Sequence, residues 1–169
     1  MPVSRSSFAL DFSLISFLIV DDQPFSRRLV RSMLLGFGSR EVYESANGAE
    51  ALELARNVMP SIIITDLVMP LFDGLRFIRM VKEAEPPAHK PPIIVLSGYL
   101  TKAAALTVRS SGAEELMVKP VSPKSLYEHI ARIVLHDQDD AASQQLAFLQ
   151  NRKRRDDRQR KKAGDLAYV

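Results

Sequence analysis

The 169-residue sequence contains no cysteine. It therefore has no disulfide framework, no thiolate metal site and no cysteine nucleophile. Long hydrophobic runs are also missing, since the longest candidate, residues 14–20, is strand-sized, whereas a membrane span needs about 20 apolar residues. Residues 1–13 include Asp11 and lack an apolar segment of signal-peptide length, which argues against export. We expect a cytoplasmic protein with no membrane segment.

Net positive charge is confined to one short run. The formal net charge is +3, but residues 151–162 alone carry +6, which leaves −3 for the rest of the chain. The basic balance therefore does not indicate that the globular part binds nucleic acid. We interpret the run as a solvated helix face or a disordered tail. A docking arm for a second protomer or partner and a non-specific polyanion contact are the alternatives.

Short apolar runs predict the strands. Five such runs occur in the first 120 residues, at 13–20, 41–45, 61–66, 92–97 and 115–119. Several are continuous in Val, Ile and Leu and do not alternate with polar residues. This pattern is typical of strands in a parallel sheet that is covered on both faces.

Segments with helical periodicity lie between these runs. Asn47 is placed to cap the second helix, Thr101 to start the fourth, and Ser122, followed by Pro123, to start the fifth. The order βα, repeated five times, predicts an α/β fold with a doubly wound parallel sheet and helices on both faces. In such folds ligands bind at the carboxyl ends of the strands, near the point where the strand order reverses.

The composition changes near residue 136. Residues 136–169 show no strand signal and comprise an acidic break, a short amphipathic stretch and the basic run. We expect an N-terminal arm at 1–12, one domain at 13–135, and a helical or disordered extension at 136–169. This extension is too short for a typical helix-turn-helix output domain, so we do not expect direct binding to DNA.

Polar side chains end four of the predicted strands. They are Asp21, Asp22, Asp66, Ser97 and Lys119. In a parallel sheet these side chains meet at one edge, where two carboxylates about 4 Å apart repel by roughly 4 kcal/mol at an effective dielectric constant near 20. The repulsion must be compensated, and Mg²⁺, which binds one or two carboxylates, waters and a phosphate oxygen, fits best.

A carboxylate beside Mg²⁺ and a lysine can attack a phosphoryl group and form an acyl phosphate. We therefore interpret Asp21 and Asp22 as metal-binding residues and Asp66 as the phosphate acceptor. A lone Asp-Asp pair is more often a surface turn. Here, however, Asp66, Ser97 and Lys119 stand at the matching ends of other strands.

Four segments carry a family resemblance. "FLIVDDQPFSRRLVRSMLL", "ITDLVMPLFDGLRFI", "IIVLSG" and "ELMVKPVSPKSL" resemble the signature regions of the CheY-like receiver domain of bacterial two-component response regulators. The resemblance covers residues 13–135, and the occurrence of all four segments in this order is highly specific. It implies a flavodoxin-like (βα)5 fold with strand order 2-1-3-4-5.

The resemblance also implies roles for site residues. Asp66 would be the phosphoacceptor, and Mg²⁺ would be bound by Asp22, Asp66 and the main-chain carbonyl of Val68, with Asp21 assisting through water. Lys119 would contact the phosphoryl group, which the hydroxyl of Ser97 would swing to meet. The peptide bond between Lys119 and the proline that follows it would be cis.

Two departures from the family pattern carry predictions. Leu116 stands where many receivers have Tyr or Phe, which argues against an aromatic rotamer switch. Val68 and Tyr99 flank the acceptor pocket with an aliphatic and a bulky aromatic side chain. Because they would hinder the attacking water more than a small polar pair, we expect a comparatively long-lived phosphoryl group.

The sequence thus predicts a single-domain response regulator rather than an enzyme. Its partner would be a sensor histidine kinase or a phosphotransfer protein. Phosphorylation would switch a protein-binding surface on the fourth and fifth helices, with possible homodimerisation through these helices or the C-terminal arm.

Two other functions are alternatives. A Mg²⁺-dependent phosphohydrolase of the haloacid dehalogenase type would usually have a second Asp two residues after the nucleophile, and neither Asp21 nor Asp66 has one. A nucleic-acid-binding module would use the basic run at residues 152–162.

Overall fold

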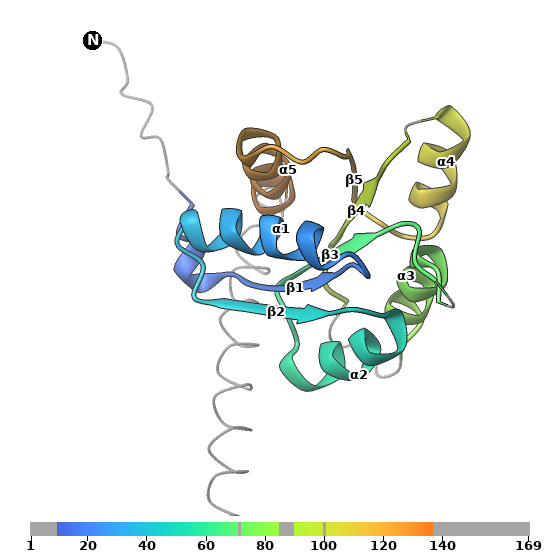
Figure 1. Cartoon of the computed structure of the whole chain (residues 1–169), viewed down its shortest axis with the longest axis horizontal. Coiled ribbons are helices and arrows are strands. Elements are labelled where there is room, and N and C mark those ends of the chain that lie inside the picture. Colours follow the sequence, from blue (N-terminus) through green and yellow to red (C-terminus); the bar gives the residue numbers. More distant parts are fainter. Residues whose placement is uncertain (1–9, 71, 85–89, 100, 137–169) are drawn as a thin grey trace, which may run out of the picture.

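The computed structural model describes residues 10–70, 72–84, 90–99 and 101–136. Strands and helices alternate along these ranges (Figure 1). The strands are β1 (Ser16–Val20), β2 (Glu41–Ser45), β3 (Ile62–Asp66), β4 (Ile93–Ser97) and β5 (Glu115–Val118). The helices are α1 (Pro24–Gly36), α2 (Gly48–Val58), α3 (Gly74–Lys82), α4 (Lys102–Ser110) and α5 (Pro123–His136).

The strands form one parallel sheet in the order β2-β1-β3-β4-β5. The predicted flavodoxin-like α/β fold and its strand order are therefore confirmed. The chain first adds β2 on one side of β1 and then places β3 on the other side. The strand order thus reverses between β1 and β3, whose register pairs Val20 with Thr65. The residues that follow this pair lie at the predicted ligand-binding edge.

Helices cover both faces of the sheet (Figure 1). Helices α1 and α5 pack on one face, where Phe17, Ile64 and Leu96 are buried. Helices α2, α3 and α4 pack on the other, where Leu18 and Val95 are buried. Because adjacent strand residues point to opposite faces, the unbroken Val, Ile and Leu runs fill both cores.

The predicted helix caps are present. The side chains of Asn47, Thr101 and Ser122 each accept a hydrogen bond from the backbone N–H three residues later, at 2.9, 3.0 and 3.2 Å. Each bond satisfies an amide that has no partner within the helix. These caps fix where α2, α4 and α5 begin. The caps of α4 and α5 therefore limit the loops that follow Ser97 and Lys119.

The start of the domain differs from the prediction. The carboxylate of Asp11 accepts hydrogen bonds from the backbone N–H and the hydroxyl of Ser13, at 3.0 and 2.6 Å, so a 3₁₀ helix at Phe12–Leu14 precedes a shorter β1. Phe12 is 2% exposed, and its ring lies 5.1 Å from that of Phe37 and 5.6 Å from that of Tyr127. Phe12, which we expected in an N-terminal arm, therefore belongs to the folded core.

A second set of polar contacts ties the opposite, amino-terminal edge of the sheet together. Lys82 Nζ donates to Glu114 Oε1 at 2.6 Å and to the carbonyl of Pro91 at 3.1 Å. The other oxygen of Glu114 accepts from the backbone N–H of Ile93 at 2.6 Å. These contacts join the end of α3 to the starts of β4 and β5. Arg40, which precedes β2 at the same edge, is exposed.

Residues 1–9 of the predicted N-terminal arm and residues 137–169 of the predicted extension, which include the basic run, lie outside the described residues. Among the helices that are described, none combines the length and apolar character that crossing a membrane requires.

Candidate functional site

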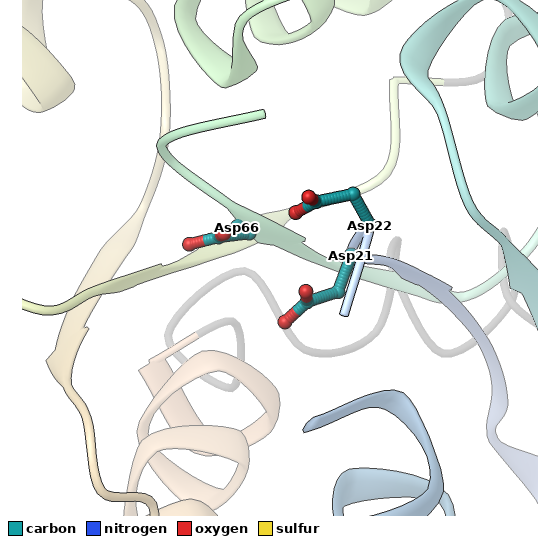
Figure 2. Close-up of side chains that lie close together, drawn as sticks. All are labelled: Asp21, Asp22 and Asp66. Atoms are coloured by element: carbon teal, nitrogen blue, oxygen red, sulfur yellow. The ribbon is translucent and has the colours of Figure 1, made fainter. Parts of the chain in front are cut away.

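Three carboxylates meet at the carboxyl edge of the sheet. Asp21 and Asp22 follow β1, and Asp66 is the last residue of β3. Each of the three offers an oxygen that lies within 4.8 Å of the others. Figure 2 shows that the carboxylates point toward the same side of the loop and strand that carry them. Asp21 and Asp66 are buried, with 1% and 7% exposure, so water screens their charges only weakly.

Lys119 supplies a positive charge to this cluster. Its Nζ lies 2.9 Å from Asp21 Oδ2 and 3.3 Å from Asp66 Oδ1. The backbone N–H of Lys119 donates to the carbonyl of Ser97 at 2.8 Å, which holds the lysine beside the end of β4. The bond between Lys119 and Pro120 is cis, as expected from the sequence. The structure thus brings together Asp21, Asp22, Asp66 and Lys119.

The charges in the cluster shift its protonation. Burial raises the pKa of the Asp66 carboxyl, and the negative charge of Asp21 raises it further. The positive charge of Lys119 lowers this pKa but does not offset the burial, so the pKa of Asp66 is raised. Burial alone would lower the pKa of Lys119, but Asp21 and Asp66 together outweigh that effect and raise it. Lys119 therefore stays charged, while Asp66 holds its negative charge less readily than an exposed carboxylate does.

Helix α1 supplies partners of Asp21 that the sequence did not predict. The backbone N–H of Gln23 donates to Asp21 Oδ1 at 2.8 Å, and the hydroxyl of Ser26 donates to Oδ2 at 2.6 Å. Arg27 donates to the carbonyl of Asp21 at 2.7 Å, and its Nε lies 3.6 Å from Glu44 on β2. The only signal in the sequence is the position of these residues in the first turn after the acidic pair.

The donor set suits a hard divalent cation. Carboxylate oxygens, completed by main-chain carbonyls and waters, are the ligands that Mg²⁺ prefers. Among the residues that the structure describes, no histidine joins the three carboxylates in this cluster. A cation would also offset the repulsion that Lys119 alone leaves among three carboxylates.

The family model of the response regulator receiver domain matches residues 17–131 of this chain. The chain belongs to this family. The chemotaxis protein CheY of Thermotoga maritima is 30% identical over 116 residues, which cover 69% of this chain and 94% of that protein. The transcriptional regulatory protein SrrA of Staphylococcus aureus is 34% identical over 128 residues, covering 75% of this chain and 51% of that protein.

Solved receiver structures share the fold. The chemotaxis protein CheY4 of Vibrio cholerae, crystallised at low pH, has a TM-score of 0.65 and 30% identity, covering 70% of this chain and 97% of that one. CheY-like receivers are signalling proteins that bind Mg²⁺ at an acidic pocket, and this receiver has such an acidic cluster.

Ser97 lies at the end of β4 in this receiver and is buried. Its hydroxyl donates to the carbonyl of Tyr99 at 2.7 Å and accepts from the N–H of Tyr99 at 3.2 Å. The hydroxyl is thus directed to the backbone of the β4–α4 loop. Ser97 thus ends a strand at the same edge of the sheet as the acidic cluster, but its hydroxyl is hydrogen-bonded to the β4–α4 loop.

The two residues that we expected to flank the phosphate acceptor face solvent. Val68 is 73% exposed and Tyr99 is 83% exposed, each two residues after a strand end. Leu116 stands where many receivers have Tyr or Phe. It is partly buried and packs against the core on the face that α2, α3 and α4 cover. The two flanking side chains can therefore change contacts with a bound group or an attacking water without disturbing the core.

Proposed function

We propose that this receiver accepts a phosphoryl group on Asp66 from a sensor histidine kinase or a phosphotransfer protein. The observation that carries the proposal is the contact of Lys119 with both Asp21 and Asp66 inside a cluster of three carboxylates. The lysine provides a cation where the oxygens of a phosphoryl group on Asp66 would lie.

The transfer exchanges one bond to phosphorus for another. A carboxylate oxygen of Asp66 bonds to phosphorus while the bond to the imidazole nitrogen of the donor breaks, and the imidazole leaves with the electron pair and takes up a proton. In this proposal Asp22, Asp66 and the main-chain carbonyl of Val68 hold Mg²⁺, with Asp21 assisting through water. Mg²⁺ supplies positive charge that offsets the phosphoryl oxygens.

The proposed output is a change on the α4 side of the domain. Phosphorylation replaces the single negative charge of the Asp66 carboxylate with the about 1.5 to 2 negative charges of a phosphoryl group. The net gain next to Lys119 is therefore about half to one negative charge. The hydroxyl of Ser97 would exchange its bond with Tyr99 for one with the phosphoryl group, which releases a constraint on the loop that leads to α4. Leu106 on α4 is apolar and exposed, as a protein-binding surface on α4 and α5 requires.

The partner follows from this role. A kinase or phosphotransfer donor must reach Asp66 from the carboxyl edge, and the switched surface would bind a target protein or a second copy of the chain. Because donor and receiver share one compartment, we place the protein in the cytoplasm, where a kinase has access to ATP.

The decisive experiment is phosphorylation by a small donor. The chain incubated with Mg²⁺ and acetyl phosphate should gain the mass of one phosphoryl group, and the Asp66→Asn variant should gain none. An unchanged wild-type mass, or equal gains in both proteins, would refute the proposal. Continuous release of phosphate from small esters would instead favour a phosphohydrolase. Salt-sensitive binding to nucleic acid that is lost on deletion of residues 150–169 would favour a role for the basic run.

A further inference from the structure

Two donors share one oxygen of Asp21. Oδ2 accepts from the hydroxyl of Ser26 at 2.6 Å and from Nζ of Lys119 at 2.9 Å, while Oδ1 accepts from the N–H of Gln23 at 2.8 Å. We propose that Ser26 is a positioning residue that lets Lys119 leave Asp21 for a phosphoryl group on Asp66. This inference rests on the proposed function.

The burial of Asp21 creates the need for a second donor. Its side chain is 1% exposed, so bulk water cannot readily solvate an oxygen that Lys119 has left. A buried carboxylate oxygen without a donor carries a large desolvation penalty. With Ser26 in place, Oδ2 keeps one hydrogen bond after the lysine moves. Ser26 therefore lowers the free-energy cost of transferring Lys119 from Asp21 to the phosphoryl group.

The contacts of Arg27 would keep Ser26 close to Asp21 after Lys119 has moved away. Ser26 stands in the first turn of α1, directly before Arg27. Arg27 donates to the main-chain carbonyl of Asp21 at 2.7 Å and also lies 3.6 Å from Glu44 on β2. These contacts anchor the first turn of α1 to the ends of β1 and β2, independently of the lysine.

A neutral hydroxyl suits this role better than a cation. It satisfies the carboxylate oxygen of Asp21 without neutralising its charge, so that charge remains available to the metal site. It also leaves Lys119 as the cation that contacts both Asp21 and Asp66. The substitution Ser26→Ala should therefore act on the phosphoryl-bound state, in which Lys119 has moved, and much less on Mg²⁺ binding, in which it has not.

The test compares two affinities in the full chain. Beryllofluoride, which mimics the phosphoryl group, is titrated at saturating Mg²⁺, and Mg²⁺ is titrated separately without fluoride. Loss of one hydrogen bond predicts that Ser26→Ala weakens beryllofluoride binding about three- to tenfold. The Mg²⁺ dissociation constant should change by less than about twofold, because binding of Mg²⁺ does not require the lysine to move. Ser26→Thr, which keeps the hydroxyl, should behave as wild type.

Ser32→Ala is the matched control. Ser32 lies on the same helix, but its hydroxyl donates to the main-chain carbonyl of Arg28 at 2.8 Å and is exposed. Its removal should leave both affinities unchanged. If Ser26→Ala does not fold, Ser26→Cys, whose thiol is a weak donor, carries the same test with a smaller expected loss.

Three outcomes would overturn the inference. Unchanged beryllofluoride binding in Ser26→Ala would show that Lys119 does not need the second donor. Equal weakening of Mg²⁺ and beryllofluoride binding would show that Ser26 only supports the fold of the site. Failure of the wild type to bind beryllofluoride at all would overturn the proposed function, and this inference with it.

Discussion

Lys119 Nζ lies 3.3 Å from Asp66 Oδ1, although Asp66 ends β3 and Lys119 follows β5, with β4 between these two strands. The same ammonium contacts Asp21, whose two oxygens also accept from Gln23 and Ser26. Both oxygens of Asp21 are thus occupied by donors that the fold supplies. Asp66 accepts from fewer donors, namely Lys119 and the backbone of Leu67, and this difference favours Asp66 over Asp21 as the residue that attacks phosphorus in the proposed function.

Removal of the negative charge of Asp66 should stabilise the metal-free protein. The pKa of Asp66 is raised in the folded state, so the folded chain binds this proton more tightly than the unfolded chain, and stability falls as the pH rises through the raised pKa. In Mg²⁺-free buffer at pH 7, Asp66→Asn should therefore unfold at a higher urea concentration than wild type. The difference should disappear below about pH 3, where the carboxyl is protonated in both states. Equal midpoints at pH 7 would contradict this account.

Loss of Lys119 should destabilise the fold. Lys119→Met leaves the carboxylates of Asp21 and Asp66 without their cation, and the side chain of Lys119 is partly exposed, so we expect a loss of roughly 1–3 kcal/mol in the free energy of unfolding without Mg²⁺. Added Mg²⁺ should recover part of it. Lys124→Met is the control, because Lys124 is exposed and lies 4.0 Å from its partner Glu128. Similar losses in the two variants would refute the prediction.

Gly74 should tolerate no side chain. A Cβ at this position would lie 2.3 Å from the carbonyl oxygen of Asp66 and 2.9 Å from Cα of Leu67, and both are backbone atoms. Gly74→Ala must displace the start of α3 from the end of β3, so we expect a loss of at least about 2 kcal/mol in stability. Gly36→Ala, with open space around it, should be neutral or slightly stabilising. Urea denaturation of both variants checks this contrast.

Mg²⁺ should stabilise the folded chain through Asp22. At 100 times its dissociation constant, a ligand that binds only the folded state adds about 2.7 kcal/mol to the free energy of unfolding. Wild type should show this gain, and Asp22→Asn should lose most of it at the same Mg²⁺ concentration. Thermal melts across a Mg²⁺ titration provide the measurement. A full gain in Asp22→Asn would exclude Asp22 as a ligand.

The phosphoryl group should be long-lived in wild type and shorter-lived when its flanks are made small and polar. Val68 and Tyr99 are exposed, and each lies two residues after a strand that ends at the same edge as Asp66, so we expect them to obstruct the attacking water. Val68→Asn combined with Tyr99→Ser should accelerate phosphate loss. The measurement is the decay of phosphorylated protein after removal of acetyl phosphate. Decay of the wild type within seconds, or no acceleration in the double variant, would count against this mechanism.

The sequence predicted those parts of the candidate site whose positions depend only on the order and direction of the strands. Asp21, Asp66 and Lys119 follow runs of Val, Ile and Leu, and parallel strands place such endings at one edge whatever the side-chain rotamers are. The bond of Ser26 to Asp21 and that of Ser97 to Tyr99 depend on rotamers and loop geometry, which residue patterns do not specify.

The start of the domain escaped prediction for a similar reason. Residues 13–15 continue an apolar run, yet the side chain of Asp11 bonds to Ser13 and turns the chain before β1 begins. Such a local side-chain bond competes with the strand, and its outcome depends on what packs around Phe12.

The contacts of Lys82 and Glu114 hold the end of the domain that is farthest from the acids, and Arg40 is exposed there. Since the chain has no native thiol, a cysteine introduced at position 40 would give a unique attachment point for a fluorophore or a surface tether. Probes placed there can monitor folding and the proposed partner binding without contacting the acidic cluster at the other end.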